Sequence, residues 1–237
     1  MFTGIVQGVA TIAEIQDHDA IRKFTLSFPE GFCEGLAIGA SVSVDGVCLT
    51  ATELLSSTSA AFDVILQSLA VTTLGSVGSQ QTVNIERAAK DGAEIGGHPL
   101  SGHVDFSSPI DSIRTLEGNK VLRIGIPSQF RRYIFPKGYI AINGASLTVA
   151  ECNKAEGWFE VWLIPETRRA TVLDGKAPGD RLNIEIERNT QVVVDTVRDA
   201  VAESLGELKP MLEALLRERG VTIEELVTPP ALLPHHH

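Results

Sequence analysis

The chain has 237 residues, of which 43% are hydrophobic and 21% are charged, and its formal net charge is −10. This composition is typical of an ordinary globular protein with room for two domains and a short tail, and it excludes a disordered chain. The negative charge and the scattered Lys and Arg residues exclude a nucleic-acid groove and disfavour acidic substrates.

Neither a secretory leader nor a membrane span is expected. The N-terminal residues lack a basic stretch followed by an apolar segment, and no run reaches the roughly 18 apolar residues of a membrane span. The cysteines Cys33, Cys48 and Cys152 are odd in number and lack metal-ligand spacing, so neither a disulfide scaffold nor a metal site is expected. We therefore expect a cytoplasmic protein without a membrane partner.

Short apolar runs separated by Gly, Asp, Asn and Ser predict antiparallel strands in a barrel or sandwich. Two other segments have apolar residues at helical intervals and predict short helices, Pro29 to Leu36 and Pro127 to Phe135. In the first part of the chain the predicted strands are Ser41 to Val44, Cys48 to Thr52, Phe62 to Leu66 and Thr82 to Glu86.

The first half of the chain is repeated in altered form. VDGVCLT at residues 44–50 recurs as INGASLT at 142–148, about 98 residues later. Each copy predicts a small domain with its own core, at residues 1–97 and 98–189, and Asp45-Gly46 and Asn143-Gly144 each predict a tight hairpin turn. Three further segments match in the same order: Phe2–Val6 with Leu100–Val104, Phe62–Val64 with Phe159–Val161, and Val83–Glu86 with Leu182–Glu185.

After Asn189 the pattern becomes helical, with an apolar stripe at Val194, Val197, Val201, Leu205 and Leu208. Because closed barrels would offer this stripe no partner, we predict that it makes a contact between subunits; the alternative is that it folds back on its own barrel. Pro210 interrupts the pattern, and a second short helix is predicted from Met211 to Arg219. This segment and its tail cover residues 190–234, and His235 to His237 resemble the remnant of a purification tag.

The densest polar cluster is GGHPLSGH at residues 96–103, which holds His98, Ser101 and His103. Imidazole titrates near pH 6.5, so two histidines beside glycines are suited to moving protons on a small ligand. The alternative is a polar loop between the domains. No phosphate-binding glycine loop, zinc-protease motif or hydrolase nucleophile motif is present.

Two further pairs of matching positions carry polar or reactive side chains. Cys48 in the first copy corresponds to Ser146 in the second, which offers a thiol in one domain and a hydroxyl in the other. A buried cysteine is more often a small core residue than a nucleophile, but a core position does not usually accept a hydroxyl without a partner. The strand ends at Ile65–Ser68 and Leu163–Thr167 both place an amide or carboxylate before a hydroxyl, a pattern suited to a polyol chain or to a solvated strand end.

Several segments together resemble riboflavin synthases of the alpha-chain type: MFTGIVQ, VDGVCLT, VNIERAAK, GGHPLSGHVD, FPKGYIAINGASLTV, LIPET and NIEIE. The resemblance runs from Met1 to about Val201. It implies an all-β fold of two similar six-stranded antiparallel Greek-key barrels, followed by a C-terminal α-helix that joins three subunits.

The same resemblance implies the reaction and the partners. Two molecules of 6,7-dimethyl-8-ribityllumazine would exchange a four-carbon unit, giving riboflavin and 5-amino-6-ribitylamino-pyrimidinedione in the last step of riboflavin biosynthesis. No metal or other cofactor is implied. Whether lumazine synthase associates with the protein is left open.

The resemblance also implies site residues. His103 would be the base, assisted by His98; Cys48, Ser146 or a water would add to C7 of the acceptor; Thr50 and Thr148 would hold the ring edges. Phe2 would lie beside the ring system, and Asn143 stands where the family carries an Asp. The implied first pocket comprises Gly4, Ile5, Val6, Cys48, Leu49, Thr50, Asp63, Val64, Ile65, Leu66, Gln67 and Ser68. The implied second pocket comprises Ser101, Gly102, His103, Val104, Lys137, Ser146, Leu147, Thr148, Trp162, Leu163, Ile164, Pro165, Glu166 and Thr167.

The sequence departs from the family pattern at two places. Asp45 and Asn143 are exchanged relative to the usual order, and Gln67-Ser68 stands where Glu-Thr is usual. We therefore expect the first pocket to hold its ligand differently. The main alternative function is a non-catalytic lumazine- or flavin-binding antenna protein, but such relatives tend to lack the cysteine and histidine set present here.

Overall fold

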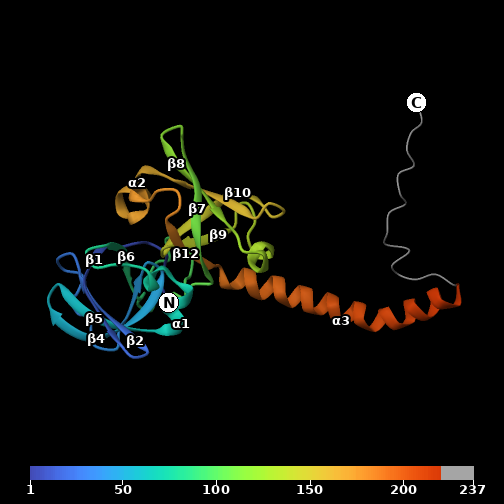
Figure 1. The fold of residues 1–237 in the computed structure, drawn as a ribbon, viewed down its shortest axis with the longest axis horizontal. Coiled ribbons are helices and arrows are strands. Elements are labelled where there is room, and N and C mark those ends of the chain that lie inside the picture. The colour runs from blue at the N-terminus through green and yellow to red at the C-terminus, as the bar shows by residue number, and fades with distance from the viewer. Residues whose placement is uncertain (220–237) are drawn as a thin grey trace. The chain divides into compact units, whose positions relative to one another are not determined.

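The structure is a computed structural model that describes residues 1–219. Residues 1–191 form one compact unit that contains two closed six-stranded barrels, and the described residues from 192 to 219 belong to a second unit. Figure 1 shows the first barrel in blue to teal and the second in green to orange. Every strand of the two barrels is antiparallel to its neighbours. The predicted tag remnant and the predicted tail after Arg219 lie outside the described residues.

The two barrels have the same strand order. In the first it is β1-β2-β5-β4-β3-β6, and in the second β7-β8-β11-β10-β9-β12 follows the same path. The strands of the first barrel are β1 (Gly8–His18), β2 (Ile21–Ser27), β3 (Ser41–Val44), β4 (Val47–Ser56), β5 (Ser59–Ile65) and β6 (Thr82–Arg87). Those of the second are β7 (Phe106–Leu116), β8 (Asn119–Gly125), β9 (Tyr139–Ile142), β10 (Ala145–Asn153), β11 (Trp158–Leu163) and β12 (Arg181–Ile186).

This order confirms the predicted pair of six-stranded antiparallel barrels. Because β5 and β11 each pair with the second strand of their barrel rather than with the next strand along the chain, the topology is a Greek key. The predicted turns are also present. Asp45 and Gly46 have φ of 46° and 82°, and Asn143 and Gly144 have φ of 45° and 78°, so two left-handed residues close each hairpin.

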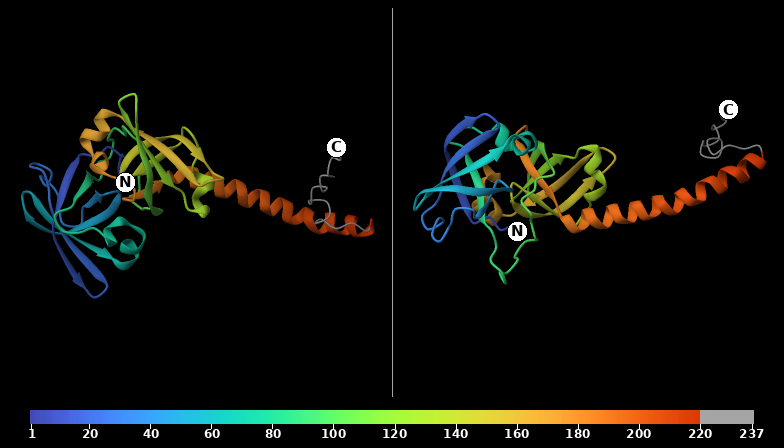
Figure 2. Two further views of the ribbon diagram at one scale, coloured as in Figure 1. Left: turned by 45° about the horizontal axis from the view of Figure 1, so that its top comes forward. Right: turned by 90° about the horizontal axis from the view of Figure 1, so that it is seen from below.

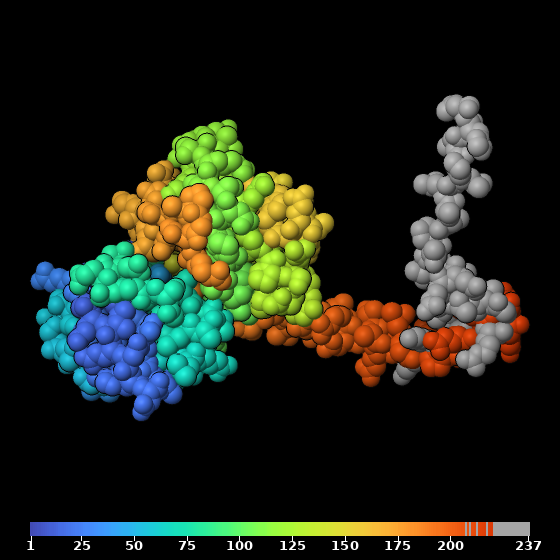
Figure 3. All heavy atoms as spheres, viewed as in Figure 1, coloured from blue at the N-terminus to red at the C-terminus, as the bar shows by residue number. Residues whose placement is uncertain are grey.

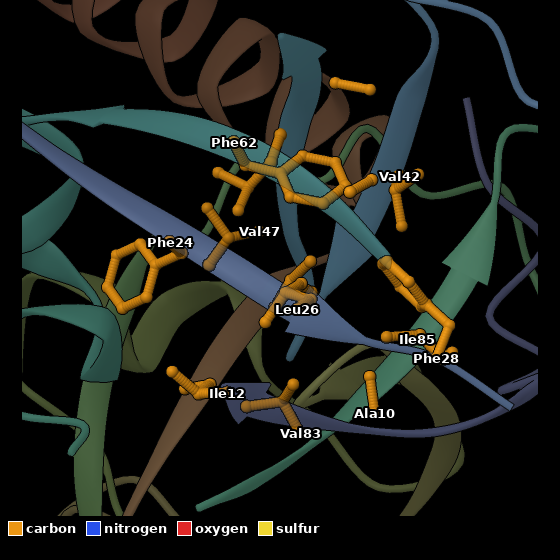
Figure 4. Close-up of a cluster of buried hydrophobic side chains, with 14 of the residues drawn as sticks. Ala10, Ile12, Phe24, Leu26, Phe28, Val42, Val47, Phe62, Val83 and Ile85 are labelled. Carbon is orange, nitrogen blue, oxygen red and sulfur yellow. The ribbon is translucent and has the colours of Figure 1, made fainter. Parts of the chain in front are cut away.

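The interior of the first barrel receives apolar side chains from all its strands. Figure 4 shows Ile12, Phe24, Leu26 and Phe62 pointing into this core, and each of them is at most 1% exposed. On β2 the buried residues Phe24 and Leu26 alternate with half-buried Lys23 and Thr25, which is the period of two expected of a strand with one face inside.

Two predicted helices are corrected. Residues 30–35 form successive turns, because Gly31 and Gly35 have left-handed φ of 81° and 64° and interrupt any helix. The second segment contains only a 3₁₀ helix, η2 (Ser128–Tyr133).

The predicted strand ends are instead helix starts. The strands stop at Ile65 and Leu163, and the short helices α1 (Leu66–Val71) and α2 (Pro165–Ala170) follow, each continued by a 3₁₀ turn, η1 (Thr73–Gly75) and η3 (Val172–Gly175).

The strand register also revises one match between the copies. Ala51 lies opposite Phe62, and its equivalent Val149 lies opposite Val161. Phe62 is therefore equivalent to Val161, not to Phe159, and Asp63 is equivalent to Trp162. The match made from the sequence is displaced by two residues from the structural one. The reason is that the similar tripeptides FDV and FEV occupy different positions in the two hairpins.

Within the described residues, the second unit is helix α3 (Arg188–Glu218), whose first residues belong to the barrel unit. The helix predicted after Asn189 is confirmed, but the predicted interruption is not, since Pro210 lies inside one continuous helix. The fixed φ of proline is compatible with a helix, so Pro210 removes one backbone hydrogen bond without ending it. Of the helices in residues 1–219, none has the length and apolar character needed to span a bilayer.

Candidate active site

Each repeat begins with a short arm that crosses between the barrels, Phe2–Ile5 in the first and Leu100–His103 in the second. Phe2 and Leu100 pair in antiparallel fashion through two backbone hydrogen bonds of 2.8 and 2.9 Å. Both barrels belong to the compact unit of residues 1–191, which Figure 2 shows from two further sides and Figure 3 as packed atoms. The arms are therefore part of the joint between the barrels.

A buried glutamate on the last strand of each barrel fixes its own arm. The Glu86 carboxylate accepts hydrogen bonds from the backbone N of Thr3 (2.6 Å), from Thr3 Oγ1 (2.7 Å) and from the backbone N of Gly4 (3.1 Å). Glu185 accepts the equivalent bonds from Ser101 N, Ser101 Oγ and Gly102 N at 2.8, 2.7 and 3.0 Å. Burial raises the pKa of both carboxyl groups, and these hydrogen bonds oppose that rise.

In addition to the glutamate of its own barrel, each arm is hydrogen-bonded to the backbone of the opposite barrel. The backbone N of Ser146 donates to the carbonyl of Gly4 (2.8 Å), and the backbone N of Cys48 donates to the carbonyl of Gly102 (2.8 Å). The next residue of each arm therefore lies over the barrel of the other repeat. Ile5 reaches the Ser146 strand, and His103 reaches the Cys48 strand.

Two cavities lie where the arms meet these strands. The first has a volume of about 220 Å³ and is lined by Val47, Cys48, Gln67, Ser68, Val71, Thr72, Gly102, His103 and Val104. The second has a volume of about 430 Å³ and is lined by Ile5, Gly96, Gly97, Tyr139, Ser146, Leu147, Thr148, Ala150, Trp162, Ile164 and Thr167.

The predicted grouping of the arms is therefore corrected. Gly102, His103 and Val104 lie with Cys48 in the first cavity, and Ile5 lies with Ser146 in the second. The reason is the crossing of the arms, which places each one against the barrel of the other repeat.

In the second cavity, Ser146 is hydrogen-bonded to a buried histidine. His98 Nδ1 lies 2.6 Å from Ser146 Oγ, and the imidazole stacks on Tyr139 with ring centroids 5.1 Å apart. His98 is 2% exposed, and burial lowers its pKa, so the ring is neutral at physiological pH. A neutral Nδ1 can accept the Ser146 hydroxyl proton or, in the other tautomer, donate to the oxygen.

In the first cavity, the thiol of Cys48 is half-buried and the imidazole of His103 is exposed. His103 is held through its backbone N, which donates to Ser101 Oγ (3.1 Å). Within residues 1–219 no hydrogen bond joins His103 to His98, so the geometry pairs His98 with Ser146 rather than with His103.

The other predicted site residues fall into three groups. Several are inside the barrels or at their joint: Phe2, Leu49, Val64, Asn143 and Leu163, all buried. Gly4 and Ser101 belong to the arms, with Val6 directly after the first. The remainder, Thr50, Asp63, Ile65, Leu66, Lys137, Pro165 and Glu166, are exposed and line neither cavity.

Asn143 and Asp45 lie at the joint between the barrels. The backbone N of Asn84 donates to Asp45 Oδ1 (2.8 Å), and the backbone N of Asn183 donates to Asn143 Oδ1 (2.7 Å). The side-chain amides cross between barrels, from Asn84 Nδ2 to the carbonyl of Asn143 and from Asn183 Nδ2 to that of Asp45, both at 2.9 Å. Because the two halves make the same contacts, Asp and Asn can exchange places without loss of these bonds.

This joint makes stability depend on pH. Burial raises the pKa of Asp45 to about 7, whereas an unfolded Asp titrates near 3.9. The folded state then holds a proton that the unfolded state releases, so stability is lost as pH rises from about 4 to about 7. We expect Asp45→Asn, which keeps the Oδ1 acceptor, to be more stable than the parent at pH 8 by on the order of 2 kcal/mol.

Urea denaturation at pH 4 and pH 8 measures this effect. The gain should shrink at pH 4, and Asp91→Asn, at an exposed position, should change stability little at either pH. If Asp45→Asn were less stable than the parent at pH 8, the buried Asp45 carboxylate would not be destabilising, and the prediction would be wrong.

Sequence reasoning assigned no role to Glu86, Glu185, Asn84 or Asn183, which hold the arms and the joint. A signal was present, since both copies carry Asn and Glu alternating with Ile on the last strand. All four side chains are at most 4% exposed, and buried polar groups of this kind require specific partners.

A model of the lumazine binding domain matches residues 3–88 and again residues 101–187. The chain is 43% identical to the riboflavin synthase of Escherichia coli over 203 residues, which cover 85% of this chain and 94% of that protein. It is 40% identical to the riboflavin synthase of Chlamydia pneumoniae over 86% of this chain and 98% of the relative. A solved structure of LumP with 6,7-dimethyl-8-(1'-D-ribityl) lumazine is 26% identical, with a TM-score of 0.71, and covers 79% of this chain and all of LumP.

Proposed function

The chain belongs to the lumazine-binding family that contains the riboflavin synthases, and we propose that it catalyses the dismutation of 6,7-dimethyl-8-ribityllumazine. Two molecules react by transfer of a four-carbon unit, giving riboflavin and 5-amino-6-ribitylamino-pyrimidinedione. The protein is therefore a transferase of riboflavin biosynthesis.

One observation carries this proposal: a single scaffold builds two equivalent cavities with different reactive groups. The first holds Cys48 and His103, and the second holds Ser146 with its neutral partner His98. A reaction between two identical molecules needs two similar sites that treat their occupants differently, one as donor and one as acceptor.

The side chains supply the roles that the chemistry requires. The C7 methyl group of the lumazine is acidic because its anion is delocalised into the ring, so His103 serves as the base that removes its proton. The nucleophile that adds to C7 of the acceptor molecule is Ser146 Oγ, Cys48 or a water. Ser146 Oγ is oriented by His98. Thr148, which lines the second cavity, and its equivalent Thr50 bind the edges of the pteridine rings. No metal or added cofactor enters these steps.

Turnover of the purified protein tests the proposal. The protein should form riboflavin when 6,7-dimethyl-8-ribityllumazine is the only substrate added. The absorbance and fluorescence of riboflavin measure its formation. Binding of the lumazine without riboflavin formation would overturn the catalytic proposal and favour an antenna-type binding protein.

We also propose a homotrimer assembled through α3. The helix exposes an apolar stripe in the single chain, with Val197, Val201, Leu205 and Leu208 between 50% and 59% exposed, and such a stripe is normally covered by another helix. Light scattering should give the mass of three chains, and Leu205→Glu should reduce it, whereas Glu203→Lys on another face should not. A trimer that survives Leu205→Glu would contradict this role.

We further propose a cytoplasmic location, which rests on the sequence features and cysteine content described above, and association with lumazine synthase, which rests on the family resemblance. Cell fractionation tests the first. Co-sedimentation of the two purified proteins tests the second.

A further inference from the structure

The two cavities differ most along one row of residues that crosses three neighbouring strands. In the second barrel, Tyr139 of β9 lies opposite Thr148 of β10. Trp162 of β11 lies on the other side of Thr148, one residue beyond the Val149–Val161 pair. Thr148 is exposed, Tyr139 is 53% exposed and Trp162 is half-buried, so this row lies on the outside of the barrel.

The equivalent row of the first barrel is polar. Ser41 lies opposite Thr50, and Asp63 lies one residue beyond the Ala51–Phe62 pair. Thr50 and Thr148 are thus common to both rows, whereas the first barrel has Ser and Asp where the second has Tyr and Trp.

The two cavities differ in their lining and in their volume in the same way. Tyr139, Thr148 and Trp162 all line the second cavity, of about 430 Å³, whereas Ser41, Thr50 and Asp63 are absent from the lining of the first, of about 220 Å³. Pockets for drug-sized ligands usually have volumes of about 300–1,000 Å³. Only the second of these two cavities falls in that range.

The aromatic row has the dimensions for a flat ring. Two strand spacings separate Tyr139 from Trp162 by about 9.6 Å at the backbone. Stacked rings approach to about 4.5 Å between centroids, so a third ring fits between the two side chains, above Thr148. Tyr139 is already fixed, because its ring stacks on buried His98 at an interplanar angle of 16°. A side chain ordered before binding loses less entropy when the ligand arrives.

We infer that Tyr139 and Trp162 hold the ring of a lumazine or flavin between them and make the second cavity the tighter of the two binding sites. This inference rests on the proposed function, in which both cavities bind such rings. It assigns these two side chains to binding and specificity rather than to proton transfer.

Titration with riboflavin tests the inference, because riboflavin alone does not react. The fluorescence of riboflavin itself should be quenched as the tighter site fills, and the Trp162 variants keep this readout. Trp162→Leu should weaken that site about tenfold, whereas Trp162→Phe, which keeps an aromatic ring, should bind within about threefold of the parent. Trp158 is the matched control, since Arg123 covers its ring at 3.8 Å and Glu156 accepts from its Nε1; Trp158→Phe should retain both the quenching and the affinity.

The reciprocal change tests the first barrel. Asp63→Trp should tighten the weaker site, because it supplies one member of the missing aromatic pair. If Trp162→Leu leaves the tighter site unchanged while the parent still forms riboflavin, the inference is wrong and the proposed function stands. If the parent binds neither riboflavin nor lumazine, both are wrong.

Discussion

Replacing His103 with Gln is expected to lower kcat by about 10²- to 10⁴-fold, the range contributed by a positioned general base. Affinity for 6,7-dimethyl-8-ribityllumazine should stay within about threefold of the parent value. Gln has a similar size and keeps hydrogen-bonding capacity, but it cannot take up a proton. His103 lines the first cavity next to Cys48, and its backbone is fixed by Ser101, so the substitution should alter chemistry rather than folding.

Steady-state rates and equilibrium binding separate these effects. His18→Gln is the matched control, because His18 lies exposed on β1, where its ring is hydrogen-bonded to Gln16 and lines neither cavity. Equal loss of turnover and affinity in His103→Gln would contradict the base role and assign His103 to binding.

The second large effect is expected at Gly102, where the arm meets the opposite barrel. Gly102 has φ of +79°, and an added Cβ would lie 2.6 Å from Cys48 Cβ, 2.9 Å from Cys48 N and 2.9 Å from Phe2 Cε2. Gly102→Ala combines the cost of a left-handed residue with overpacking against backbone. We expect a loss of about 2–5 kcal/mol in the free energy of unfolding, measured by urea denaturation.

Gly118 separates the two contributions, because it has the same φ of +79° but open space around its Cβ position. Gly118→Ala should cost only about 1–2 kcal/mol, from the backbone conformation alone. Equal losses in the two variants would show that the close approach of the arm to Cys48 contributes nothing.

The barrels could be predicted because their signals are local and repeated. Asp45-Gly46 and Asn143-Gly144 each require left-handed backbone between apolar strands, and both hairpins are observed. Alternation of apolar and polar residues placed β3 and β6 correctly to within a residue. Both features depend on residues close together in the sequence.

The composition of the site could not be predicted in the same way. Which barrel an arm packs against depends on hydrogen bonds from Ser146 to Gly4 and from Cys48 to Gly102, across large sequence separations. The repeat alone is compatible with either arrangement. Pairing of His98 with Ser146 has the same origin, since the two residues meet only when the loop at 96–99 packs on β10.

Helix bounds were misjudged where glycines ended a periodic apolar pattern and where a proline did not. Glycines at 31 and 35 stopped a helix that the apolar spacing predicted, whereas Pro210 failed to stop α3. Neither α1 nor α2 has a side-chain N-cap, so the capping signal for a helix start was missing in both copies. Pro165 at the start of α2 was the signal that the second copy did carry.

Duplication should give each chain two cavities that each bind one lumazine. Calorimetric titration of the His103→Gln variant with 6,7-dimethyl-8-ribityllumazine counts them, because this variant binds the ligand without consuming it at an appreciable rate. We expect each chain to bind one equivalent in each cavity, and a further Trp162→Leu change should weaken the tighter one. A single equivalent per chain, at saturating ligand, would contradict this expectation.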